Sequence, residues 1–66
     1  IMLPEKETVA LQIKDLSTGA VVYNQTIRPA DLNGILIVDI IGKNGETKDY
    51  EIYIDGQYYT TQQVAF

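Results

Sequence analysis

The chain contains no cysteine, no histidine and no tryptophan. Without cysteine no disulfide can support the fold, and without cysteine or histidine there is no thiolate or imidazole ligand for a metal ion. Nucleophilic catalysis of the Ser-His or Cys-His kind is excluded for the same reason. We therefore expect no catalytic residue, no metal and no cofactor, and we interpret the chain as a non-enzyme.

Basic residues are scarce as well. Five Lys and Arg residues stand against nine Asp and Glu residues, which gives a formal net charge of −4. Nucleic-acid binding needs clustered Lys and Arg to neutralise phosphates, and the basic residues here are scattered. No apolar run approaches the roughly 20 residues that a transmembrane helix needs. The sequence thus predicts neither a nucleic-acid partner nor a membrane span.

What the chain does contain is a series of strand-like runs, each closed by a turn that includes glycine. Residues 8–15 alternate between apolar and polar side chains, which is typical of a half-buried strand. A short loop ending at Gly19, with positive φ, predicts a hairpin that Pro29 ends, with Val21, Tyr23 and Ile27 on the apolar face of the first strand. The expected pairs are Val9 with Ile27, Leu11 with Gln25 and Ile13 with Tyr23.

Residues 35–41 read Ile-Leu-Ile-Val-Asp-Ile-Ile, and this pattern predicts a central strand with both faces covered. Asn44-Gly45 and Asp55-Gly56 predict two-residue turns with positive φ at both central residues. The expected pairs are Ile41 with Lys48, Asp39 with Tyr50, Ile37 with Ile52, Ile35 with Ile54, Ile52 with Tyr59, Tyr50 with Thr61 and Tyr53 with Tyr58. The fold class is therefore all-β: a small antiparallel sandwich of about five strands, complete or incomplete.

These registers divide the side chains between two faces. The predicted core face carries Ile35, Ile37, Ile52, Ile54 and Tyr59. The reverse face carries Leu36, Val38, Ile40, Tyr53, Tyr58 and Thr60, which is too apolar to stay bare on a monomer. We expect binding through this face and a strand edge, either to further copies in a homo-oligomer or to a protein partner. The alternative is a sandwich in which the first hairpin covers this face through Val9, Leu11, Ile13 and Tyr23, so that little apolar surface remains to drive association. The predicted binding residues are Leu36, Val38, Tyr53, Tyr58 and Thr60.

Two interpretations remain open for the tyrosines of that face. Tyr53 and Tyr58, with Thr60 and Gln62, can form a flat polar and aromatic strip for contact with carbohydrate or peptide. The alternative is that the two rings pair across strands to stabilise the sheet, or are buried against a second sheet or copy.

The remaining polar candidates for chemistry are Ser17, Asp39 and the stretch Asp31-x-Asn33-Gly34. Ser17 is expected to be a turn residue. Asp39 is expected to accept a hydrogen bond from Tyr50 or a loop amide, the alternative being a catalytic acid. Asp31-x-Asn33-Gly34 begins like a calcium-binding loop, but Gly42 stands where the bidentate Glu should be, so a turn cap is favoured.

The chain also resembles a known group of proteins. Leu11-x-Ile13-x-Asp15-x-x-Thr18-Gly19-x-Val21-Val22-Tyr23, followed by Leu32-Asn33-Gly34 and the apolar run after it, is similar to immunoglobulin-like sandwiches of Bacteroides-type bacteria. Those sandwiches occur in small secreted proteins of unknown function and in carboxy-terminal sorting domains. The resemblance implies an immunoglobulin-like fold and a secreted or cell-envelope location, and it supplies no catalytic residues.

Residues 1–66 are thus interpreted as a single all-β domain. The predicted function is that of a non-catalytic secreted or cell-envelope interaction module. The alternative is a structural or accessory domain, or a fragment, of a larger extracellular protein.

Overall fold

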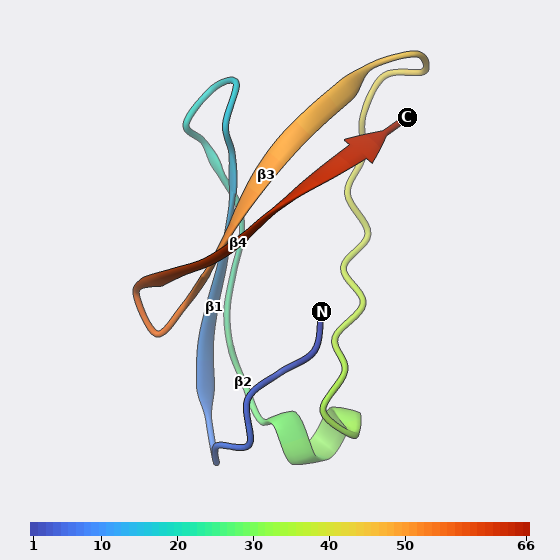
Figure 1. Cartoon of the computed structure of the whole chain (residues 1–66). Coiled ribbons are helices and arrows are strands. Elements are labelled where there is room, and N and C mark those ends of the chain that lie inside the picture. Colours follow the sequence, from blue (N-terminus) through green and yellow to red (C-terminus); the bar gives the residue numbers. More distant parts are fainter.

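The computed structural model describes all residues, Ile1–Phe66, and shows one antiparallel sheet with a long extended segment beside it (Figure 1). The strands are β1 (Val9–Asp15), β2 (Val21–Ile27), β3 (Thr47–Ile54) and β4 (Gln57–Ala65), and a short 3-10 helix, η1 (Pro29–Leu32), follows β2. The order in the sheet is β2-β1-β3-β4. The all-β class is therefore confirmed, with four strands in place of the expected five.

The first hairpin forms in the predicted register. Val9 faces Ile27, Leu11 faces Gln25 and Ile13 faces Tyr23, and Gly19 has the expected positive φ of 74°. A register shift after Ile13 places Val21 opposite Lys14. Val21 consequently lies on the polar face rather than the apolar face, and it is half exposed. The prediction for Val21 is wrong because the bulge reverses the alternation of side chains at that point.

The second hairpin, β3 with β4, also forms around its predicted turn. Asp55 and Gly56 both have positive φ, 51° and 79°, and Tyr53 faces Tyr58. A second bulge lies immediately beyond this pair. It leaves Tyr59 without a partner, so that Ile52 faces Thr60 and Tyr50 faces Gln62, each one residue away from the prediction.

The predicted central strand is wrong. Residues 35–41, hereafter the crossing segment, belong to no ladder, and β3 pairs with β1 instead, through Leu11 with Ile54, Ile13 with Ile52 and Asp15 with Tyr50. The reason lies in the turn at Asn44-Gly45. The prediction of positive φ at both central residues is wrong for Asn44, because only Gly45 has positive φ. Turns of the unprimed types splay the flanking chains, whereas the primed types match the twist of a hairpin. The crossing segment thus diverges from β3.

The core lies between the sheet and the crossing segment. Its buried apolar side chains are Val9, Leu11, Ile13, Leu36, Tyr50 and Ile52. Val38 and Ile40 pack against this cluster from the crossing segment. Its odd-numbered isoleucines point the other way, with exposed fractions of 54% for Ile35, 84% for Ile37 and 97% for Ile41. The predicted alternation therefore exists, but its direction is the reverse of the one expected.

The first residues of the chain hold the start of the crossing segment in place. Met2 forms a β-bridge with Ile35, and the backbone amide of Leu36 donates to the carbonyl of Ile1. The N-terminal ammonium of Ile1 donates in return to the carbonyl of Leu36 at 2.8 Å. Ile1 and Leu3 add their side chains to the core cluster. Residues 1–3 thus pair with the crossing segment at one end only.

Candidate functional site

The predicted binding residues do not lie on one surface. Tyr53 and Tyr58 lie together on the face of the sheet that points away from the core. Leu36 is buried and Val38 packs against the core cluster, so both lie on the core side of the sheet. Thr60 faces Ile52 and shares its side of the sheet. The structure therefore separates the predicted set into a tyrosine pair on one face and core-side residues on the other.

The two tyrosines make their polar contacts within the chain. Their rings are 6.1 Å apart between centroids in an edge-to-face arrangement, with an interplanar angle of 82°. The Tyr53 hydroxyl donates to a Glu51 carboxylate oxygen at 3.1 Å, and this hydrogen bond, with burial, raises the pKa of Tyr53. The Tyr58 hydroxyl shares a hydrogen bond with Thr61. This geometry fits cross-strand stabilisation, in which an edge-to-face pair contributes about 0.5 to 1.5 kcal/mol.

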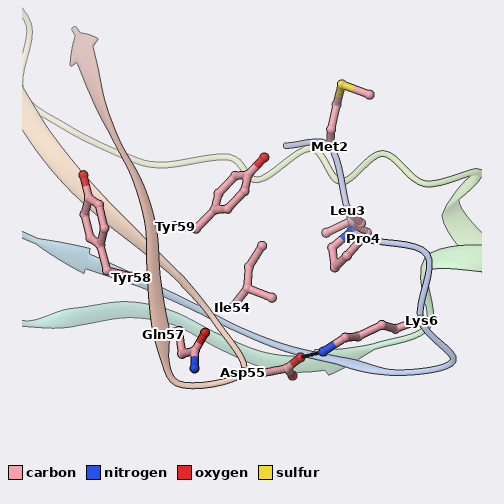
Figure 2. Close-up of a pocket in the computed structure, with 9 residues that line it drawn as sticks. All are labelled: Met2, Leu3, Pro4, Lys6, Ile54, Asp55, Gln57, Tyr58 and Tyr59. Carbon is pink, nitrogen blue, oxygen red and sulfur yellow. Dashed lines mark hydrogen bonds and ion pairs between the residues drawn. The ribbon is translucent and has the colours of Figure 1, made fainter.

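A pocket of about 520 Å³ lies between the N-terminal residues and the β3–β4 hairpin (Figure 2). Tyr59, the residue that the bulge leaves without a partner, extends into it on the side of Met2. The pocket is lined by Met2, Leu3, Pro4, Lys6, Ile54, Asp55, Gln57, Tyr58 and Tyr59. Its size falls within the range of about 300 to 1,000 Å³ that small-molecule pockets occupy.

The charges at the edge of this pocket neutralise each other. The Lys6 ammonium lies 2.8 Å from the Asp55 carboxylate, and the backbone amide of Ala10 donates to the other Asp55 oxygen at 3.0 Å. These two hydrogen bonds, that of Lys6 first, lower the pKa of Asp55. The pocket is therefore suited to an uncharged, apolar or aromatic group.

The crossing segment has a different property: its backbone is unpaired. Beyond Leu36, none of the backbone N–H or C=O groups of residues 37–42 forms a hydrogen bond within the chain. The next pairing comes at the turn, where the Glu46 amide donates to the Lys43 carbonyl. Figure 1 shows this stretch as an extended chain beside the sheet. Extended backbone with free donors and acceptors is the geometry of an edge strand that lacks a neighbour.

The side chains of the crossing segment also pack loosely. An apolar pocket of about 210 Å³ lies beneath it, and its lining comes from Ile1, from the sheet and from four residues of the crossing segment: Leu36, Ile37, Val38 and Ile40. The lining contributed by the sheet comes from Ile13, Tyr50, Ile52, Gln62 and Val64.

Asp39 is exposed and accepts no hydrogen bond, so the contact expected from Tyr50 or a loop amide is absent.

One polar cluster was not anticipated from the sequence. Asp15 is only 5% exposed, and its carboxylate accepts hydrogen bonds from the Lys48 ammonium at 2.9 Å and from the Ser17 hydroxyl at 2.7 Å. The Lys48 hydrogen bond, followed by that of Ser17, lowers the pKa of Asp15 to about 2. Ser17 is a turn residue, as predicted, and the Asp-x-Ser spacing was the available signal. The contact with Lys48 depends on the pairing of β1 with β3.

No group of three or more potential metal ligands gathers in the structure. Asn33 is the C-cap residue of η1, which agrees with the turn-cap interpretation, whereas Asp31 lies inside η1 and its side chain makes no capping hydrogen bond. The structure also has no helix with the length and hydropathy that crossing a membrane requires.

Comparison with known proteins finds no matching family model, no matching curated protein and no matching solved structure.

Proposed function

We propose that this chain is a non-catalytic interaction module that binds an extended segment of another protein along residues 37–42. The observation that carries the proposal is the unpaired backbone of these residues. An incoming strand would satisfy the free N–H and C=O groups, and alternate side chains would provide specificity, as in other cases of strand addition.

The direction of the free groups favours one edge of the crossing segment. The N–H and C=O of Leu36 both point to Ile1. Because backbone groups alternate direction along an extended chain, those of Ile37, Asp39 and Ile41 point to the opposite edge. No segment of this chain lies hydrogen-bonded along that edge. We therefore expect the partner strand to pair there.

The outward side chains support a partner that is itself apolar at alternate positions. Ile37 and Ile41 are among the most exposed hydrophobic residues of the chain, and Asp39 is the only charge between them.

A secreted or cell-envelope location and the immunoglobulin-like resemblance remain predictions. The same surface would serve the alternative function, that of an accessory domain packed on other parts of a larger protein.

The test compares two substitutions at one exposed position. Asp39→Pro removes a backbone donor from the free edge, whereas Asp39→Ala removes the same carboxylate and keeps the donor. Proline fits an extended chain, so both variants should retain the wild-type melting temperature. Short peptides selected from a displayed library on the wild-type protein serve as probes.

We expect the selected peptides to bind Asp39→Ala as well as wild type and to bind Asp39→Pro about tenfold or more weakly, measured by fluorescence anisotropy. Equal binding to both variants, or a selection that yields no binder, would contradict strand addition at this segment.

A further inference from the structure

The charged residues are distributed unusually over the sheet. The inner strands β1 and β3 carry Lys14, Asp15, Lys48, Asp49 and Glu51, whereas the outer strands β2 and β4 carry no charged residue and no proline. Monomeric proteins normally protect an edge strand with charges, especially lysine, or with proline, so that it does not pair with another chain. Here that protection is missing from both edges.

The two edges are not equivalent. In β2 the bulge at Val21-Val22 and the stop at Pro29 leave a short regular stretch. In β4 the bulge at Tyr59 lies near the start, and the pairing with β3 is regular from Thr60 onward. It continues past the strand, where the Phe66 amide donates to the Glu46 carbonyl at 2.8 Å. Residues 60–66 therefore form the longer flat edge.

We propose that this edge of β4 pairs with β4 of a second copy of the chain, antiparallel, with Gln63 on the two-fold axis. Since the Phe66 amide points to β3, alternation directs the backbone groups of Thr61, Gln63 and Ala65 away from β3, toward solvent. Centring the ladder on Gln63 uses all of residues 60–66 and avoids the bulge. Thr61 then pairs with Ala65 of the second copy, and Gln62 with its Val64.

Two further observations favour a second copy as the occupant. Each chain carries a net charge of −4, so two copies repel in most orientations, but this contact brings no charged side chain of either strand together. The chain also buries only 8 of its 66 residues, which is marginal for independent folding. An isologous contact would join two sheets into one continuous sheet and close the exposed edge.

This inference is independent of the proposed function, which concerns the crossing segment. The first experiment measures mass by sedimentation equilibrium for wild type, Gln63→Lys and Asn24→Lys. Both variants change the net charge equally at an exposed edge position, but only Gln63→Lys sets two like charges opposite each other across the axis.

We expect a wild-type dimer, an unchanged Asn24→Lys dimer and a Gln63→Lys dimer weakened about fivefold or more, with all three proteins folded. A monomeric wild type, or equal weakening by both lysines, would overturn the proposal.

Cysteine substitution then tests the register, because the chain has no cysteine of its own. Residues directly opposite each other lie about 5.5 Å apart between Cα atoms, within reach of a disulfide. Gln63→Cys should therefore form a covalent dimer under mild oxidation, and Asn24→Cys and Gln62→Cys should remain largely monomeric on a denaturing gel. Preferential cross-linking at Asn24 or Gln62 would overturn this register.

Discussion

The two hairpins and the crossing segment are all rich in β-branched residues, but only the hairpins form strands of the sheet. Both hairpins contain β-branched and aromatic runs, and all four of their strands pair within ladders. The crossing segment is the most apolar run of the chain, yet its backbone from residue 37 to 42 is unpaired. The apolar side chains of the crossing segment thus favour its packing on the core. The geometry of the turn at Gly45 directs the segment away from β3, so it does not pair with the sheet.

The largest effect on the free energy of unfolding should come from truncating a core residue of a hairpin. The matched control truncates an outward residue of the crossing segment. Leu11 is fully buried, whereas Ile37 is 84% exposed. We expect Leu11→Ala to lower the free energy of unfolding by about 2 to 5 kcal/mol and Ile37→Ala to change it by less than about 0.5 kcal/mol. Urea unfolding of both variants measures this difference, and comparable losses would mean that the crossing segment is packed as tightly as the hairpins.

The next prediction concerns the polar contact that joins β1 to β3. The folded-state pKa of Asp15 is about 2, below its ordinary value of 3.8, so the ionised form stabilises the fold at neutral pH. This contribution is fully present above pH 4 and is lost as the pH falls through the folded-state pKa. Asp15→Asn should therefore melt below wild type at pH 6, and the difference should shrink as the pH approaches 2 in thermal melts at successive pH values.

A constant difference in melting temperature across this pH range would contradict the proposed role of the Asp15 carboxylate. Lys48→Met is the matched variant, because it removes the same ion pair from the side of β3. Lys48→Met should show most of the decrease in melting temperature that Asp15→Asn shows at pH 6. Its melting temperature should also approach that of wild type as the pH falls toward 2.

The smallest effect is expected at the turns. Gly56 and Gly45 both have positive φ, 79° and 84°, and neither has a heavy atom close to the place of an added Cβ. Gly56→Val and Gly45→Val should each destabilise the fold by roughly 1 kcal/mol or more, through backbone strain alone. Thermal unfolding of the two variants checks this, and unchanged melting temperatures in both would contradict positive φ at these glycines.

Some features could be predicted from local sequence because they depend on neighbouring residues. The register of the first hairpin follows from the alternation of Val9, Leu11 and Ile13 and from the turn at Gly19. The Asp55-Gly56 turn follows from two residue types that tolerate positive φ. The bulges at Val22 and Tyr59 were missed, because the sequences around them carry no glycine or other signal of an inserted residue.

The candidate sites were less accessible to sequence reasoning. The pocket at Tyr59 forms because residues 1–4, far away in the chain, lie against the β3–β4 hairpin. The predicted binding residues are divided between two sides of the sheet, with Tyr53 and Tyr58 on one face and Leu36 and Val38 on the core side. This division follows from the pairing of β1 with β3. That pairing joins residues about 40 positions apart, and no local pattern encodes it.

The sequence by itself determined the all-β class, two of the hairpins and the absence of the Ser-His and Cys-His arrangements, because these depend on residue type and on period-two alternation. Only the tertiary structure decided which strand fills the centre of the sheet, because the pairing of β1 with β3 joins residues far apart in the chain. The crossing segment is apolar on both sides apart from Asp39, and the cost of burying that carboxylate favours the orientation in which Asp39 faces outward. Pairing with residues 1–3 then holds the start of the segment beside the core.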